Sequence, residues 1–167
     1  SNAVSDFTAS DVTLTGTAGA DTVAVSGSGR AYYVTVSGMT QSGTVIASIA
    51  PGAAHDRSGR GNAASTSSDN TVAYDVTPPL AAISQSVAQA DPTASPLIRF
   101  TVAFSEEVVG LTAEDVTFGG SAPGTLVAEV TGSGATYEVV VSGMTGDGTV
   151  TVAIPAGAAQ DLAGNDS

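Results

Sequence analysis

The chain has 167 residues, with sixteen Asp and Glu against four Arg and no Lys, which gives a formal net charge of -12. Such an acidic surface disfavours binding to nucleic acid or to anionic lipid, and the lack of cysteine excludes a disulfide framework and thiolate chemistry. Apolar residues make up 42% of the chain but aromatic residues only 5%, which favours strands built from Val, Ile and Thr over helices.

The sequence shows no signal peptide. Residues 1–3, Ser1-Asn2-Ala3, resemble the remnant of a cleaved expression tag. No apolar run approaches the roughly 20 residues of a membrane-spanning helix. We therefore expect residues 4–167 to be an interior piece of a longer protein that does not insert into a membrane.

The sequence repeats itself. Phe7 to Thr13 matches Leu111 to Thr117 at a spacing of 104, and Ser37 to Thr40 recurs as Ser142 to Thr145 at a spacing of 105. The match extends over about fifty residues, which is too long for coincidence and predicts two copies of one domain of about 100 residues.

Alternating apolar residues and turn signals predict short strands in both copies. In the first copy we expect four strands followed by a closing strand at 71–75. In the second copy we expect six strands, at 81–89, 97–105, 115–119, 125–131, 135–142 and 148–154. The glycine-rich stretches at 27–29 and 132–134 are predicted hairpin turns. Short strands separated by Gly and Ser are typical of an all-β sandwich.

The phase of the repeat predicts two incomplete domains. We assign residues 4–78 to a first repeat that lacks its first two strands, and residues 79–167 to a second repeat that lacks its last strand. Unpaired strand edges invite pairing between chains. We therefore expect a dimer or an exchange of strands.

Several motifs, in order along the chain, resemble the bacterial immunoglobulin-like repeats of large extracellular adhesins and biofilm-associated proteins. They are Phe104 to Val108, Leu111 to Val116, the strand Gly148 to Val152 and Asp161 to Asn165, and Tyr74 to Pro79 resembles the junction between successive repeats. The resemblance implies immunoglobulin-like β-sandwiches in tandem, an extracellular or cell-surface location, and a structural spacer or adhesive role, often with calcium at the junctions. The segment 56–62, which we align with 161–165 as a loop two residues longer, departs from the pattern.

Carboxylates are concentrated at sequence positions that an immunoglobulin topology brings together. In that topology three loops lie at the same end as the N-terminus of the domain, which in the second copy is the end that receives the linker. The candidate ligands there are Asp75, Glu106, Glu107, Asp115, Asp161 and Asn165, with Glu114 beside them. Calcium takes about six to eight oxygen ligands, so we predict a calcium site where the neighbouring repeats meet. The alternative is that these Asp and Asn residues only form turns, because their side chains bond nearby backbone groups.

Nothing else in the sequence points to an active site. Paired carboxylates catalyse glycoside hydrolysis when they face one another, but Glu106 and Glu107 are adjacent and should point to opposite faces of a strand. His55 is matched by Gln160 in the second copy, so we expect an exposed loop residue. We therefore predict that the chain is not an enzyme.

The four tyrosines offer a different function. Tyr32, Tyr33, Tyr74 and Tyr137 could form a platform for sugars, but their positions within predicted strands favour core or edge roles. The principal prediction is a structural spacer of a surface or secreted adhesin. The alternatives are a module that itself binds a host or matrix glycan or protein, and an accessory module of a secreted multidomain enzyme.

Overall fold

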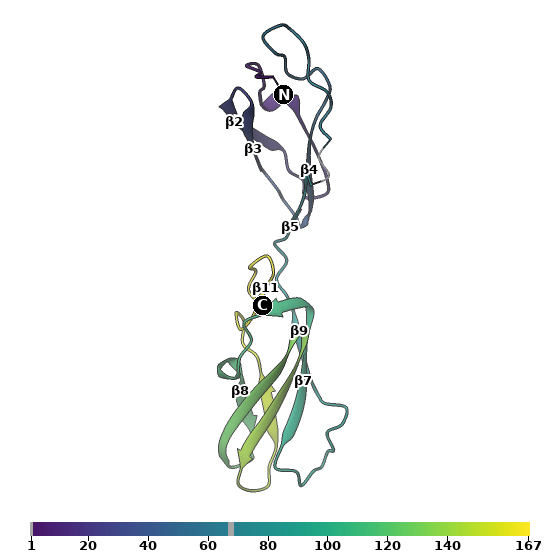
Figure 1. Cartoon of the computed structure of the whole chain (residues 1–167). Helices are drawn as coiled ribbons and strands as arrows, with labels where there is room; N and C mark the ends of the chain where they lie inside the picture. The colour runs from purple at the N-terminus through teal and green to yellow at the C-terminus, as the bar shows by residue number, and fades with distance from the viewer. Residues whose placement is uncertain (1, 67–68) are drawn as a thin grey trace. The chain divides into compact units, whose positions relative to one another are not determined.

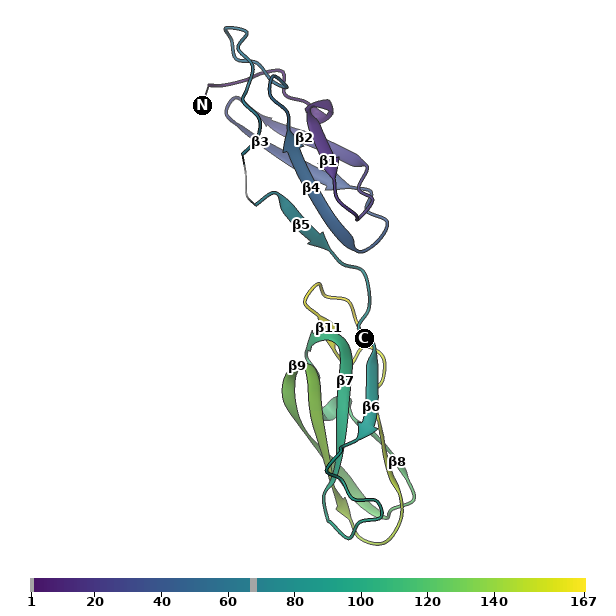
Figure 2. The same cartoon turned by 90° about the vertical axis from the view of Figure 1, so that its right-hand side faces the viewer.

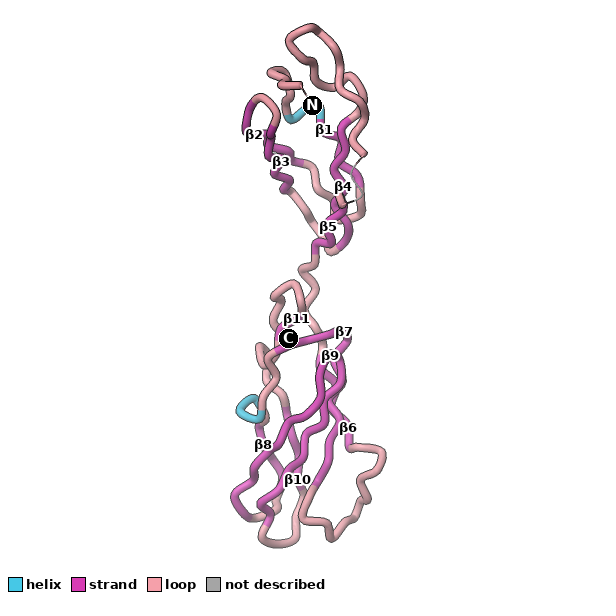
Figure 3. Tube along the Cα trace, viewed as in Figure 1, coloured by secondary structure: helices cyan, strands magenta, loops and turns pink. Residues whose placement is uncertain are grey.

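The computed structural model describes residues 2–66 and 69–167, and antiparallel strands dominate it (Figures 1 and 3). The chain divides into two compact units, Ser1–Val76 and Thr77–Ser167. In the part of the chain that the structure describes, no helix is long and apolar enough to span a membrane.

Within its described residues, the first unit contains one 3₁₀ turn and five strands. The 3₁₀ turn η1 covers Ala9–Asp11, and the strands are β1 (Val12–Thr15), β2 (Thr22–Ser28), β3 (Ala31–Ser37), β4 (Gly43–Ile49) and β5 (Thr71–Tyr74). β4 lies between β1 and β5 in one sheet, and β2 pairs with β3 in a second (Figure 2). The register of β2 and β3 places Ser28 opposite Ala31, so the chain turns tightly there, as the glycine-rich stretch predicted.

The first unit has a thin core. Among its described residues, the fully buried apolar side chains are Ala18 and Ala54. All seven residues of β4 are only half-buried, and Val72 of β5 is 65% exposed. The strands are therefore held mainly by their backbone ladders, with little apolar burial to add to them.

The second unit contains one 3₁₀ turn and six strands. The 3₁₀ turn η2 covers Ala113–Asp115, and the strands are β6 (Ala81–Gln85), β7 (Ile98–Val109), β8 (Thr117–Gly120), β9 (Gly124–Met144), β10 (Val150–Ala153) and β11 (Gln160–Asp161). β7 pairs with β6, β9 and β11, whereas β8 pairs with β10 (Figure 3). β9 folds back on itself at 132–134, since the backbone of Gly132 lies against Tyr137 and that of Gly124 against Gly143.

The core of the second unit lies between its two sheets. Val102 of β7 and Val139 and Val141 of β9 are fully buried, and they follow the period of two expected of strands with one inward face. Phe104 meets Tyr137 edge to face, with ring centroids 6.0 Å apart. Half-buried residues of β10 pack against this cluster from the opposite sheet. The second unit is thus an antiparallel β-sandwich, and the all-β prediction is confirmed.

The repeat in the sequence is also a repeat in structure. The hydroxyl of Tyr32 donates to the carbonyl of Val4 at 2.9 Å, and that of Tyr137 donates to Val108 at 2.9 Å. The two 3₁₀ turns have the same capping box. In each, the Asp carboxylate at the third position accepts a hydrogen bond from the backbone N–H of the Thr that precedes the turn. Equivalent residues therefore make equivalent contacts.

The observed strands differ from the predicted ones in one place that matters for the site. β7 runs on to Val109, whereas the prediction ended that strand at residue 105. Its register shifts between Ala103 and Val108, and this irregularity interrupts the alternation of apolar residues on which the prediction relied. Glu106 and Glu107 therefore lie within a bulged strand and not in the following loop.

Candidate metal centre

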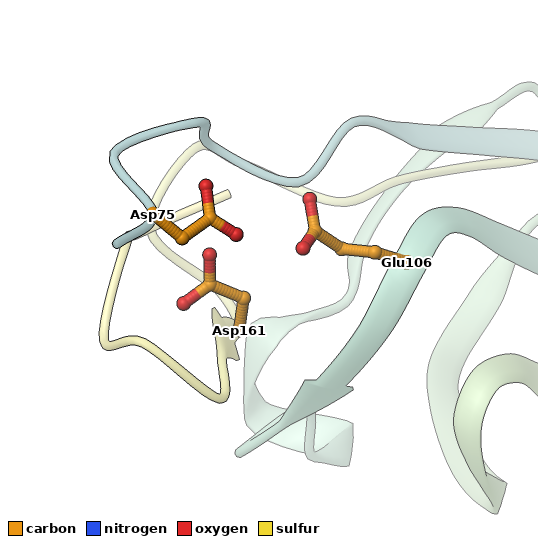
Figure 4. Close-up of side chains that lie close together, drawn as sticks. All are labelled: Asp75, Glu106 and Asp161. Atoms are coloured by element: carbon orange, nitrogen blue, oxygen red, sulfur yellow. The ribbon is translucent and has the colours of Figure 1, made fainter. Parts of the chain in front are cut away.

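Glu106 and Glu107, in the bulge of β7, differ in their exposure to solvent. Glu106 is half-buried, whereas Glu107 is exposed and lies beside Gly134 at the turn of β9. Adjacent residues of a strand point to opposite faces, and the extra residues of the bulge redirect these two side chains. Glu106 points toward the loop that contains Asp161 (Figure 4), and Glu107 is not part of the carboxylate group there.

Asp161 is the buried member of the site, with 3% of its surface exposed. Its Oδ1 atom accepts hydrogen bonds of 2.8 Å from the backbone N–H groups of Ala163 and Asn165, and its Oδ2 atom accepts one of 2.7 Å from the Asn165 side chain. Burial acts to raise the pKa of Asp161, but these hydrogen bonds outweigh it and lower the pKa below its ordinary value. The carboxylate is therefore ionised at neutral pH although it is buried.

Asp75 completes a group of three carboxylates. It lies in the segment that leads into Thr77, and Ser42 donates a hydrogen bond of 2.8 Å to its Oδ1 atom. One carboxylate oxygen each from Asp75, Glu106 and Asp161 lie within 4.8 Å of one another. Figure 4 shows the three side chains converging from three separate segments of the chain. Oxygens at this spacing are close enough to share one cation of the size of calcium, whose bonds to oxygen measure about 2.3–2.6 Å.

The other predicted ligands have different surroundings. Asn165 adjoins the group through its bonds to Asp161. Asp115 caps η2, where its Oδ2 atom accepts from the N–H and hydroxyl of Thr112 at 2.8 and 2.7 Å. Glu107 and Asp115 do not belong to the group of three, and Glu114 is exposed in the first turn of η2.

The sequence of the second unit offers little positive charge near this group. Arg99 is the single basic residue between Thr77 and Ser167, and its guanidinium donates to Glu138 at 2.9 Å. Three carboxylates brought this close repel one another. The arrangement is therefore one that a divalent cation would stabilise.

The matching loop of the first unit is balanced by its own cation. Asp56 corresponds to Asp161 at the spacing of 105, and Arg60 corresponds to Asn165. Arg60 bonds Asp56 through two guanidinium nitrogens at 3.1 and 2.9 Å, and Asn2 donates to the same carboxylate at 2.8 Å. The hydrogen bonds from the backbone of Arg60 and the side chain of Asn2, followed by those from the backbone of Ser58 and the Arg60 guanidinium, hold the pKa of Asp56 well below its ordinary value.

This comparison corrects one prediction. The segment 56–62 is not two residues longer than its partner, because its hydrogen bonds recur at a constant spacing of 105. Asp56 N–H bonds the carbonyl of Arg60 as Asp161 N–H bonds that of Asn165, and Asn62 N–H bonds the carbonyl of Ala54 as Ser167 N–H bonds that of Ala159. The prediction aligned Asn62 with Asn165 by residue type, whereas the backbone aligns Arg60 with it. Arg60 follows Asp56 by four residues, as Asn165 follows Asp161. This shared spacing is the sequence signal that gives the correct alignment.

His55 is not part of this carboxylate group, and the tyrosines do not form one platform. His55 is exposed in a loop, as predicted, and its Nδ1 atom lies 2.9 Å from Asp6. The backbone N–H of His55 and its ring hold the pKa of Asp6 below the ordinary value. Tyr137 is buried and Tyr33 is 74% exposed, so the tyrosines do not share one surface.

Comparison with known proteins identifies the family. The model of the bacterial Ig-like domain matches residues 75–167, a span that begins at Asp75 and includes Glu106 and Asp161. No curated protein and no solved structure matches the chain. The match covers more than half of the sequence and agrees with the antiparallel sandwich of the second unit. The chain therefore belongs to the bacterial Ig-like domain family.

Proposed function

We propose that this chain is a non-catalytic spacer from a surface or secreted bacterial adhesin, and that calcium rigidifies it at Asp75, Glu106 and Asp161. Bacterial Ig-like domains are structural modules that are typically non-catalytic and commonly extracellular or displayed on the surface. The adhesin role rests on the resemblance of the ordered motifs of the second copy, and of the junction Tyr74 to Pro79, to adhesin repeats. The calcium site rests on a separate observation, namely the three converging carboxylates.

The chemistry of the group favours calcium among the common cations. All three side chains offer carboxylate oxygens, which are the ligands that a hard cation prefers, and no sulfur or imidazole is among them. Three side-chain ligands leave room for backbone carbonyls and water in the coordination shell of about six to eight oxygens. Bound calcium would also relieve the repulsion between the carboxylates.

A site that includes Asp75 would act on the linker. Asp75 precedes Pro78 and Pro79 by three and four residues, and prolines restrict the chain to extended conformations. An ion shared by these three carboxylates would hold Asp75, which precedes the two prolines, to Glu106 and Asp161, which follow them. The linker would then bend less, which suits a spacer that holds an adhesive tip away from the cell.

Calorimetry on the whole chain tests the calcium site. Titration with calcium after removal of metal by a chelator should give saturable heat, and melting should rise with calcium and fall again with the chelator. Glu106→Gln should weaken binding at least about tenfold, since it removes one charged ligand of three. Glu107→Gln is the matched control, because it changes the adjacent exposed residue, and it should bind calcium as the unmodified chain does.

Two results would overturn this assignment. One is an absence of heat and of any change in melting at millimolar calcium. The other is an equal loss of affinity in both glutamine variants, which would indicate general charge screening and no defined site. The spacer role is tested separately on a glycan array, where a pure spacer should bind nothing.

A further inference from the structure

Asp75 is held in place by a side chain of the first unit. The hydroxyl of Ser42 donates a hydrogen bond of 2.8 Å to Oδ1 of Asp75, and the same hydroxyl accepts one of 3.0 Å from the backbone N–H of Val76. A serine hydroxyl has a single proton to donate, so this proton points at the carboxylate. All three residues belong to the compact unit Ser1–Val76.

The position of Ser42 follows from the pairing of β4 with β5. Gly43, the first residue of β4, lies opposite Tyr74, the last residue of β5. Continuing this antiparallel register by one residue puts Ser42 opposite Asp75. The side chain of Ser42 therefore ties Asp75 to the end of this sheet.

Asp75 and Asp161 are oriented in comparable ways. The loop of Asp161 holds its carboxylate through the N–H groups of Ala163 and Asn165 and the Asn165 side chain. Ser42 does the same for Asp75, from 33 residues away along the chain. A carboxylate has about four lone-pair positions, so these hydrogen bonds do not prevent it from binding a cation. Ligands that are ordered before the ion arrives lose less entropy when it binds.

Ser42 lies outside the part of the chain that matches the family model. That match begins at Asp75 and includes all three carboxylates of the group. At the spacing of 105, the second copy has Asp147 in place of Ser42, and an ionised carboxylate has no proton to donate to another. The bond to Asp75 is thus a property of the first copy and is not built into every repeat.

We propose that Ser42 is a positioning residue for the calcium site, so that the first unit sets the affinity for the ion bound by Asp75, Glu106 and Asp161. This inference rests on the proposed calcium site and adds a residue of the first unit to it. Because coupling between two equilibria is reciprocal, calcium in turn stabilises the contact of Ser42 with Asp75 and Val76. Calcium then acts on the end of the sheet formed by β4 and β5 as well as on the linker.

Calorimetry of calcium binding to the whole chain tests this role. Ser42→Ala removes the hydroxyl and should weaken calcium binding about three- to tenfold, since a hydrogen bond to a charged ligand is lost. Ser42→Thr keeps a hydroxyl at this position and should recover most of the affinity. Ser48→Ala is the matched control, because it makes the same change near the other end of β4, where the hydroxyl contacts Thr13, and it should bind calcium as the unmodified chain does. Melting curves in the presence of a chelator show that each variant folds.

A double-mutant cycle separates positioning from a general effect on the fold. In a chain that carries Asp75→Ala, Ser42→Ala should lower the calcium affinity no further, because the carboxylate through which Ser42 acts is gone. In a chain that carries Glu106→Gln, Ser42→Ala should lower it by the same factor as in the unmodified chain. Equal losses in the two backgrounds would show that Ser42 only supports the fold, and would refute the proposal.

Hydrogen exchange measures the reciprocal effect. Saturating calcium should slow exchange of the Val76 N–H, which donates to the Ser42 hydroxyl, by the same factor of about three to ten in the unmodified chain. In Ser42→Ala calcium should have little effect on this N–H. Equal calcium affinity in Ser42→Ala and the unmodified chain would refute the positioning role and leave the calcium site in place. An absence of calcium binding to the unmodified chain would overturn both.

Discussion

The side chain of Asn165 donates a hydrogen bond of 2.7 Å to Oδ2 of Asp161, at the place where Arg60 bonds Asp56 in the first unit. The two loops share their backbone hydrogen bonds and differ in the charge of this partner. In the first unit the aspartate is neutralised from within the loop. In the second the partner is neutral, and two further carboxylates converge on the same point.

Asn165→Arg should therefore convert the second loop to the type found in the first. The guanidinium would bond Asp161 and supply the positive charge that calcium otherwise brings, so calcium affinity should fall at least about tenfold in calorimetry. Leu162→Arg is the matched control, because it adds the same charge in the same loop at a side chain that is 77% exposed. An equal loss in both variants would show that only the net charge matters.

The pH dependence of stability should report Asp161. Its folded pKa lies below the ordinary value of 3.8, so its contribution is fully present above the unfolded pKa and is lost as the pH falls through the folded pKa. Without calcium, the second unit should be stable from neutral pH to about 4 and weaken progressively below that. Hydrogen exchange at Val139 from pH 2.5 to 6 measures this, with the rates corrected for intrinsic exchange. Asp161→Asn should be weaker near pH 6 and lose part of the acid dependence, whereas a parallel profile in both proteins would assign the transition to other carboxylates.

Tyr137→Phe should destabilise the second unit by about 1–2 kcal/mol, because it removes the partner of a buried carbonyl, that of Val108, and keeps the ring in place. Chemical denaturation followed by hydrogen exchange at β7 measures the change. Tyr32→Phe removes the equivalent bond to Val4 in the first unit, where the hydroxyl is only part-buried and water can replace it. If Tyr32→Phe lowered the stability of its unit as much as Tyr137→Phe lowers that of the second unit, the expected dependence on burial would be wrong.

Val139→Ala should cost roughly 2 kcal/mol of the stability of the second unit, since it removes two buried methyl groups from a fully packed position. Val127→Ala removes the same groups from a side chain on the same strand that is 57% exposed, and its effect should stay within about 0.5 kcal/mol. The midpoints of urea unfolding, compared at equal slope, give both values. Similar costs at the two positions would mean that β9 does not bury one face only.

The fold could be predicted to a large extent from local pattern. Alternation in Val102 and Phe104, and again in Tyr137 and Val139, predicted strands with one buried face, and the glycine-rich stretches predicted the hairpin turns. The extension of β7 through Glu106 and Glu107 could not be predicted in this way. A bulge is stabilised by pairing with distant strands, and it breaks the alternation on which the local prediction depends.

The candidate site could likewise be predicted only in part. The topology of a sandwich brings the segments of Asp75, Glu106 and Asp161 to one end, and this requires only the order of the strands. The pattern could not distinguish Glu106 from Glu107, because the bulge decides which of them points toward Asp161. Nor could it show that Asp115 is engaged by Thr112, since a capping carboxylate and a metal ligand are the same residue type in sequence.

The sequence alone determined the all-β class, the repeat and the acidic character of this protein, because these depend on composition, periodicity and spacing along the chain. Only the tertiary structure decided which carboxylates meet and which loop carries its own cation. Those features depend on distances between residues far apart in the sequence, and such distances are set by strand pairing and by the packing of the two sheets.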